Sequence, residues 1–334
     1  MATMKQVAEK AGVSTTTVSH VINETRVVSK EVQERVRAVI QELHYIPSAV
    51  ARSLKNDKTH TLGMLVPNSS NPYFAELIQG IEDAAFSLGY SIILCNSYDD
   101  PKKQVAYVRV LMEKRIDGLI LVSSGSDREL IQLLSDESIP KVLVDRELPG
   151  VAADFVETDH EQAGYLATKY LIDLGHRDIA CVSGPQDLLS SSARVAGYRR
   201  ALREARIKAR ADHVVHADFT SKGGFDAFGK LLAQRTRPTA VFAGNDLMAI
   251  GGICAAEALR VRVPDDLSVV GYDDIALASY CNPPLTTIRQ PKREIGALTA
   301  RALVERINDG EAPPRRELLQ PTLVVRKSTA APAA

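Results

Sequence analysis

The sequence of 334 residues lacks any long hydrophobic run. No segment approaches the roughly 20 consecutive apolar residues that a membrane-spanning helix requires. The first ten residues, MATMKQVAEK, are polar and amphipathic, without the apolar core and small-residue cleavage site of a signal peptide. These absences argue against a membrane protein, and we expect the chain to stay in the cytoplasm without a membrane partner.

The sequence also lacks the short motifs of common α/β enzymes. It has no G-x-G-x-x-G after its first expected strand, no G-x-x-x-x-G-K-[ST], no G-x-S-x-G and no H-E-x-x-H. Four of its histidines show no spacing typical of metal ligands: His160, His176, His213 and His216. We therefore expect no enzymatic activity, no catalytic residue, no metal and no cofactor.

Paired cysteines are absent as well. The four cysteines lie far apart, without a C-x-x-C pair, and three of them lie among apolar residues. This pattern favours reduced structural thiols over a redox or metal role. The four are Cys95, Cys181, Cys254 and Cys281.

The chain carries no net charge, because 41 basic residues balance 41 acidic residues. A neutral chain has no general affinity for nucleic acid. The charges are unevenly spread, however, since residues 1–60 hold nine Lys or Arg residues against six Asp or Glu residues. This basic excess in one small segment is compatible with DNA binding there and does not by itself require it.

Residues 1–45 predict three short helices and no strand. Thr3 and Gln6 form a T-x-x-Q capping box at the start of the first helix, and Gly12 suits its end. Ser14 caps a second helix, and a third begins near Ser29. A helix, a glycine turn, a second helix and a packing helix form a helix-turn-helix module. The second helix presents an inner face of Val18, Val21 and Ile22.

From residue 60 the sequence predicts alternating strands and helices. Short apolar runs suit buried parallel strands, and a helical segment follows each. About 270 residues of this alternation exceed one sheet, so we expect an α/β body of two doubly wound parallel sheets, with a ligand site at the strand ends between the two lobes. The expected strands are Leu62–Val66, Ser91–Cys95, Gly118–Val122, Lys141–Val144, Ile179–Val182, Ala240–Ala243 and Ser268–Gly271.

These patterns divide the chain into three parts. Residues 1–46 form the helix-turn-helix headpiece, and residues 47–59 form a linker with a short helix that is marginal without a partner. Residues 60–330 are expected to form the two-lobed α/β body. Its N-terminal lobe is expected at about 60–160 plus 291–322, and its C-terminal lobe at about 161–290 plus 323–330. The tail after Val325, RKSTAAPAA, is small and polar, and we expect it to be disordered.

Three segments carry a resemblance to a known family. The run VAEKAGVSTTTVSHVIN resembles the signature of the lactose-repressor family, and ELHYIPSAVARSLK resembles its hinge. The similarity covers the whole chain and continues through GYDDIALASYCNPPLTTIRQP. The resemblance implies a DNA-binding repressor with a sensor like a periplasmic binding protein. Within the family, the sequence most resembles repressors that respond to ribose, and next those that respond to purines.

The headpiece residues have two interpretations. The first residues of the second helix in such a module face base edges in the major groove, although a polar face alone could be mere surface. The resemblance implies that Thr15, Thr16 and His20 read bases. It also places four residues near DNA phosphates: Ser14, Asn23, Arg26 and Tyr45.

The linker residues have an implied role too. The resemblance implies that the hinge helices of two subunits enter the minor groove together, with Leu54 as an apolar wedge that Lys55 assists. The alternative for Leu54 is packing on its own lobe. The resemblance thus implies a homodimer, with residues 60–330 as the effector-binding and dimerisation domain. The two-fold symmetry of this homodimer predicts a near-palindromic double-stranded operator.

Polar and aromatic side chains follow several expected strands, as a sugar site requires. Each has an ordinary alternative as a helix cap or a surface ion pair, so the prediction rests on the set. The sensor also resembles periplasmic ribose-binding proteins, which implies that all ten residues contact a sugar, ribose first, and that Tyr73 replaces a phenylalanine. The ten are Asn71, Tyr73, Phe74, Asp145, Arg146, Arg194, Phe219, Asn245, Asp273 and Gln290.

Other effectors and functions stay open. Leu188 and Arg146 stand where the purine repressors carry arginine and tryptophan, which argues against a purine. A phosphoprotein-responsive repressor and a sugar-binding transport protein are further alternatives. We expect the sugar to close the cleft, separate the hinge segments and release DNA, while the opposite sign also occurs in the family.

Overall fold

The computed structural model describes residues 2–45, 58–122, 127–309 and 313–332. The chain divides into two compact units, Met1–Thr59 and His60–Ala334. Among the described residues, no helix combines the length and the apolar character needed to span a bilayer. Residues 46–57, which include the expected hinge residues Leu54 and Lys55, lie outside the described residues.

The first unit is helical, as the sequence predicts. The Thr3 side chain accepts from the backbone N–H of Gln6, and the Gln6 side chain accepts from the backbone of Thr3. Gly12 ends the first helix at φ 66°, a left-handed conformation that glycine adopts without strain. Ser14 caps the second helix through the N–H of Thr17. The three helices are α1 (Met4–Ala11), α2 (Thr15–Asn23) and α3 (Lys30–Glu42).

A small apolar core joins these helices. It consists of short and β-branched side chains with one aromatic ring, which fits a unit too small for a large core. The helix-turn-helix prediction is confirmed. The core residues are Val7, Ala8, Ala11, Val18, Val21, Val36, Val39 and Tyr45.

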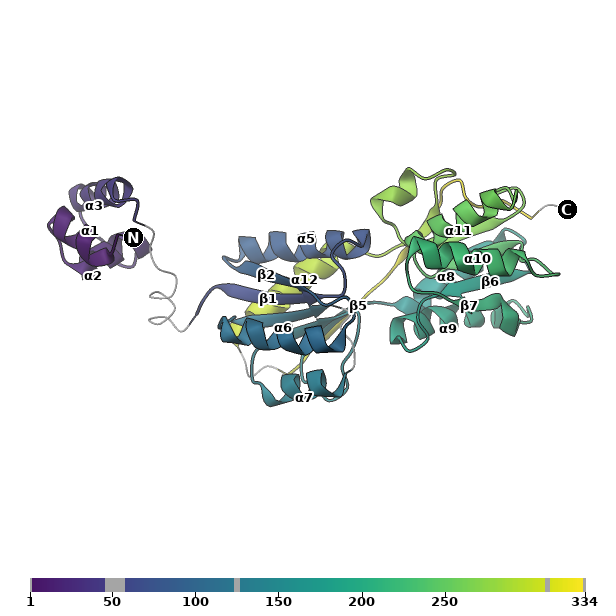
Figure 1. Cartoon of the computed structure of the whole chain (residues 1–334), viewed down its shortest axis with the longest axis horizontal. Helices are drawn as coiled ribbons and strands as arrows, with labels where there is room; N and C mark the ends of the chain where they lie inside the picture. Colours follow the sequence, from purple (N-terminus) through teal and green to yellow (C-terminus); the bar gives the residue numbers. More distant parts are fainter. Residues whose placement is uncertain (1, 46–57, 123–126, 310–312, 333–334) are drawn as a thin grey trace. The chain divides into compact units, whose positions relative to one another are not determined.

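The second unit contains two six-stranded sheets, here called sheet A and sheet B. Sheet A has the order β11-β5-β4-β3-β1-β2, and every pairing is parallel. Helices α5 and α12 pack together on one face, and α6 and α7 lie on the other (Figure 1). Its strands are β1 (Thr61–Val66), β2 (Ser91–Asn96), β3 (Gly118–Val122), β4 (Lys141–Val144), β5 (Asp154–Thr158) and β11 (Arg316–Leu319), and its helices are α5 (Pro72–Ser87), α6 (Pro101–Glu113), α7 (Arg128–Asp136) and α12 (Lys292–Asn308).

Sheet B has the order β12-β10-β9-β8-β6-β7 and is parallel except for the antiparallel edge strand β12. Helices α8 and α9 pair with each other, as do α10 and α11, and each pair covers one face. Its strands are β6 (Ile179–Ser183), β7 (Val214–His216), β8 (Ala240–Ala243), β9 (Ser268–Asp273), β10 (Thr286–Arg289) and β12 (Thr322–Val324), and its helices are α8 (His160–Asp173), α9 (Leu189–Glu204), α10 (Ser221–Leu232) and α11 (Asp246–Ala258).

The chain passes between the two sheets three times, after β5, after β10 and after β11. Each sheet is therefore built from segments that are far apart in the sequence. The first passage leads directly into α8, so His160, its first residue, lies just beyond the end of a sheet A strand. The prediction of two parallel sheets with helices on both faces is confirmed.

Two glycines bring α8 and α9 into backbone contact. A Cβ atom on Gly164 would lie 2.1 Å from the carbonyl oxygen of Arg194, and one on Gly197 would lie 2.0 Å from that of Glu161. These approaches are far closer than any side chain allows, so both positions require glycine. The close packing holds Arg194 of α9 beside the first turn of α8.

The C-terminal tail differs from the prediction of disorder. Ser328 donates from its hydroxyl to the carbonyl oxygen of Val269 at 2.6 Å, and the N–H of Ala330 donates to Ser268 Oγ at 3.0 Å. Small polar residues pack here because their backbone and hydroxyl groups hydrogen-bond to β9, a contact that composition does not reveal. The expectation for residues 326–332 was wrong.

Candidate functional site

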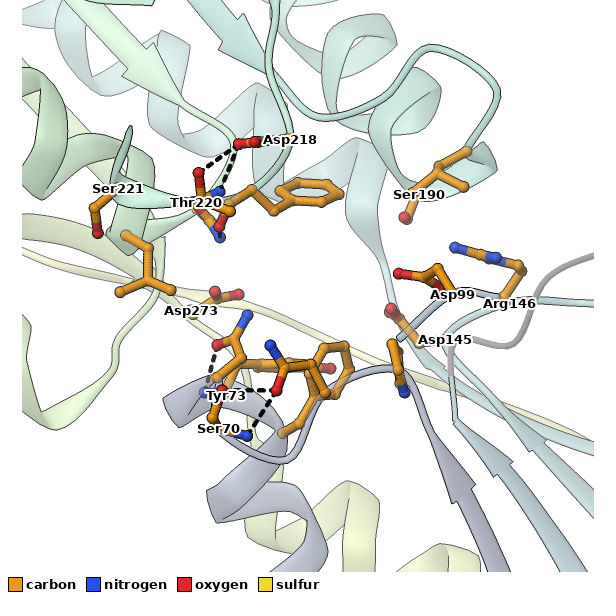
Figure 2. A pocket seen from close by; sticks show the side chains of 18 of the residues that line it. Ser70, Tyr73, Asp99, Asp145, Arg146, Ser190, Asp218, Thr220, Ser221 and Asp273 are labelled. Carbon is orange, nitrogen blue, oxygen red and sulfur yellow. Dashed lines mark hydrogen bonds between the residues drawn. The ribbon is translucent and has the colours of Figure 1, made fainter. Parts of the chain in front are cut away.

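A cavity of about 260 Å³ lies in the second unit, where the strands of sheet A and sheet B end. Figure 2 shows Ser70 and Tyr73 on one wall, with Asp218, Thr220 and Ser221 across from them. Nine of the ten sequence-predicted residues line it, and the tenth, Gln290, lies behind Tyr73 and Asp273. The nine are Asn71, Tyr73, Phe74, Asp145, Arg146, Arg194, Phe219, Asn245 and Asp273. Their role in binding stays a prediction.

Arg194 is the central cation of the cavity. It lies in the second turn of α9 rather than at its start, and only 5% of it is exposed. Its Nη1 donates to the carbonyl oxygen of Gly244 at 2.7 Å, and its guanidinium lies 3.9 Å from the ring centroid of Tyr272. Its Nε is buried without a hydrogen-bond partner among the described residues. A buried donor of this kind costs free energy unless a ligand oxygen accepts from it.

Asp273 is a buried carboxyl at the end of β9. Burial raises its pKa to about 7, although nearby Arg194 and the hydrogen bond from Gln290 Nε2, at 2.8 Å, oppose that rise. Asp246, at the start of α11, is also buried, and burial together with Asp273 raises its pKa. Asp273 lines the cavity beside Arg194, so a ligand that donates hydrogen bonds would relieve the desolvation of its carboxyl. Asp246 lies outside the lining and already accepts from Thr287 and from the N–H of Ile275.

Tyr73 is held by the opposite sheet. Its hydroxyl donates to Gln290 Oε1 at 3.4 Å, and burial raises its pKa, so it remains a neutral donor. Gln290 in turn donates to Asp273. The hydroxyl that distinguishes Tyr73 from phenylalanine is thus engaged within the wall of the cavity.

The backbone is strained where the cavity residues lie. Asp145, Phe219 and Asp273 have φ values of 67°, 63° and 114°, a region that non-glycine residues rarely occupy. Such strain clusters at functional sites, where it fixes the direction of a side chain. Gly184 is needed here as well, because a Cβ atom on it would lie 2.0 Å from the ring of Phe219.

Two asparagines combine helix capping with a place in the cavity wall. Asn71 caps α5 by accepting from the N–H of Tyr73 at 3.1 Å. Asn245 caps α11 through the N–H of Met248 at 2.8 Å and donates to the carbonyl oxygen of Phe219 at 2.9 Å. Asn245 therefore fixes Phe219 in addition to facing the cavity.

Sequence reasoning missed several lining residues. Asp99 follows β2, Asp218 and Thr220 follow β7, and Ser190 lies in α9. The strand-end rule that selected Asp145 would also have found Asp99 and Asp218. Burial raises the pKa of Asp99, while Arg146 beside it opposes the rise (Figure 2).

The expected DNA-facing residues lie in the first unit. Thr15 and Thr16 are exposed in the first turn of α2, and His20 Nδ1 lies 2.8 Å from Thr25 Oγ1. Exposed residues near them include Ser14, Asn23 and Arg26. Tyr45 differs, because it is only 8% exposed and belongs to the apolar core. The Tyr45 ring packs in the core of the first unit. The contact of Tyr45 with DNA phosphate remains a prediction, as do the other DNA contacts.

Two family models match the chain. Residues 3–48 match the model described as bacterial regulatory proteins, lacI family. Residues 59–327 match the model described as periplasmic binding proteins and sugar binding domain of LacI family. The two matches correspond to the two units and together cover most of the chain.

Individual proteins match along the whole length. The HTH-type transcriptional repressor PurR of Pectobacterium carotovorum is 47% identical over 334 residues, which covers 99% of this chain and 97% of that protein. The lac repressor dimer bound to operator and the anti-inducer ONPF is 31% identical, with a TM-score of 0.90 and 99% of each chain covered. A LacI family regulator from Enterococcus faecium with bound ribose is 33% identical, with a TM-score of 0.74, covering 81% of this chain and 99% of that one.

Proposed function

This chain belongs to the LacI family of bacterial transcriptional regulators, and we propose that it is a cytoplasmic repressor whose operator affinity is set by a small neutral effector in the cavity between sheets A and B. It acts as a homodimer on a near-palindromic operator, with α2 in the major groove. Its relatives are repressors and not enzymes. The observation that carries the proposal is Arg194 with its unpartnered Nε beside Asp145 and Asp273.

The side chains of the cavity favour a pentose, ribose first. A sugar hydroxyl can donate to a carboxylate and accept from a guanidinium at once, so neighbouring hydroxyls suit Arg194 between two acids. Phe74 and Phe219 supply apolar faces for the C–H surface of a ring. The two carboxylates oppose a phosphorylated ligand, although Arg146 and Arg194 partly offset this repulsion.

A purine base is the second candidate, and the curated relatives favour it over ribose. Relatives that carry the name PurR match nearly the whole chain at 45–48% identity. The same two aromatic rings could stack a planar base. Against this, Leu188 and Arg146 line the cavity where the purine repressors are expected to carry arginine and tryptophan.

Calorimetry on the full-length protein separates these candidates. Ribose, xylose, hypoxanthine and guanine are titrated separately, and operator binding is measured with and without each. Binding of ribose with release of DNA supports the first proposal. Binding of a purine alone overturns the pentose and supports the second candidate, whereas tighter DNA binding with either ligand reverses the sign of regulation. Failure of all four to bind contradicts both candidates.

A Thr16→Val variant is expected to bind selected operator DNA about tenfold more weakly, because valine keeps the shape of threonine but loses the hydroxyl that meets a base edge. Duplexes selected by the full-length protein from a random pool are used in a gel-shift titration. Thr322→Val, an exposed threonine of β12, is the matched control and should bind DNA normally. Equal affinity of the Thr16 variant and the control would remove Thr16 from the base-reading set.

A further inference from the structure

His160 links the two sheets behind the cavity. Its side chain is 4% exposed, and its Nε2 lies 2.6 Å from Asp145 Oδ1, at the end of a sheet A strand. Its Nδ1 lies 2.6 Å from the hydroxyl of Tyr272, in strand β9 of sheet B. His160 does not itself line the cavity, whereas Asp145 does.

The neighbours of His160 fix the position of its proton. Arg194 Nη2 lies 3.4 Å from Nδ1, and a guanidinium can only donate. The Tyr272 hydroxyl, 2.6 Å from the same nitrogen, can donate to it as well. Nδ1 therefore carries the lone pair, and Nε2 carries the hydrogen and donates it to Asp145.

In this arrangement the N–H at Nε2 donates to Asp145 Oδ1 at 2.6 Å. His160, in the helix α8 that packs on sheet B, contacts one carboxylate oxygen of Asp145. The backbone of Asp145, at φ 67°, is fixed at the end of a sheet A strand. The direction of the carboxylate is therefore set by both lobes. A residue that hydrogen-bonds to a binding group without touching the ligand commonly sets the orientation of that group and its strength as an acceptor.

We propose that His160 is a positioning residue for the effector, which holds Asp145 of sheet A against Tyr272 and Arg194 of sheet B so that the carboxylate presents a fixed acceptor to the ligand. This inference rests on the proposed effector cavity. It also deepens that proposal. His160 forms a bridge between Asp145 and Tyr272, so the direction of the Asp145 carboxylate in the sheet A lobe depends on the position of the sheet B lobe. Effector binding at Asp145 is then coupled to the relative position of the two sheets.

A histidine buried for structural reasons alone provides the comparison. His176 is 1% exposed, and its Nδ1 lies 2.9 Å from Thr239 Oγ1 while its Nε2 lies 2.9 Å from the carbonyl oxygen of Ala330. None of these partners lines the cavity. Changes at His176 should lower stability without changing effector affinity, and this separates packing from positioning.

The binding test uses whichever of ribose and hypoxanthine binds the wild-type protein. His160→Leu should weaken binding about 10- to 100-fold, because it removes the donor that orients Asp145. His160→Gln restores an N–H near the same place and should recover part of the affinity. In an Asp145→Asn background, His160→Leu should add less than about threefold, because the two residues act through one contact. His176→Leu should leave affinity unchanged.

Two results of the binding test would overturn the inference. Equal affinity of His160→Leu and the wild-type protein is one, and full additivity of the His160 and Asp145 changes is the other. The tautomer gives a test that needs no effector: nitrogen-15 NMR of labelled histidine should show hydrogen on Nε2 of His160, with a signal that moves in Asp145→Asn. A hydrogen on Nδ1 contradicts the bridge. If neither ligand binds the wild-type protein, the effector proposal fails while this spectrum still decides the bridge.

Discussion

Replacing Arg194 with methionine should weaken effector binding by at least about a hundredfold. Methionine fills similar space but removes the only buried guanidinium described in the cavity, together with its unpartnered Nε. Truncating one partner of a buried, hydrogen-bonded charge contact with a ligand costs about 2–5 kcal/mol of binding free energy, because the other partner is left buried and unpaired. Near Arg194 lie the carboxyls of Asp145 and Asp273, which raise its pKa although burial opposes the rise.

Calorimetric titration of the Arg194→Met protein measures this loss. Arg199→Met, an exposed arginine on the same helix, is the control and should bind effector as the wild-type protein does. A thermal melt accompanies both titrations, so that unfolding is not mistaken for lost affinity. An Arg194→Met protein that folds and binds effector normally would show that the cavity has been assigned to the wrong ligand chemistry.

An Asp273→Asn variant should be more stable than the wild-type protein at about pH 8, by a margin that falls to less than half at about pH 5. The folded pKa of about 7 lies above the ordinary value of 3.8, so the folded state prefers the protonated form. The contribution of Asp273 to stability is complete below about pH 4 and is lost as the pH rises through 7. The full difference corresponds to at most about 4 kcal/mol.

Denaturant unfolding at the two pH values measures this gain. Asn keeps the oxygen that accepts from Gln290, so the wall of the cavity stays intact. Asp274→Asn is the control with the opposite sign, because Arg326 and Arg289 hold the pKa of Asp274 below its usual value. The same Asp273→Asn protein should bind effector more weakly. Equal stability at both pH values would mean that Asp273 is ionised in the folded protein without cost.

Local rules account for most of the fold. The run Leu62–Val66 predicts β1, which the structure extends by only Thr61, and Gly118–Val122 is β3 without change. The caps at Thr3, Ser14 and Asn71 are where the sequence places them. These features depend on residues within a few positions of one another, so the sequence is enough to find them.

The edge strands and the tail were harder to predict. Strand β11 is mostly exposed, so it lacks the apolar run that marks a buried strand. The tail packs because Ser328 and Ala330 meet β9, about 60 residues earlier in the chain. Hydrophobic patterns carry no information about such polar contacts.

The cavity residues, too, are predictable only in part. Strand ends predict Asp145, Asn245 and Asp273, because the carboxyl ends of parallel strands meet at one edge. His160 follows β5, a strand that was not among those expected, and its contact with Tyr272, 112 residues away, has no local signal in the sequence. Nor does spacing reveal the left-handed backbone that directs Asp145 into the cavity.

The three passages of the chain between the sheets have a consequence for synthesis on the ribosome. Strands β11 and β12 complete the edges of sheet A and sheet B, and α12 covers sheet A, yet all three come from residues 292–324. Neither lobe can finish folding until these residues have been translated. The headpiece, with its own core, is complete some 250 residues earlier in the nascent chain. A prematurely terminated product would therefore carry a folded DNA-binding unit without the body that regulates it.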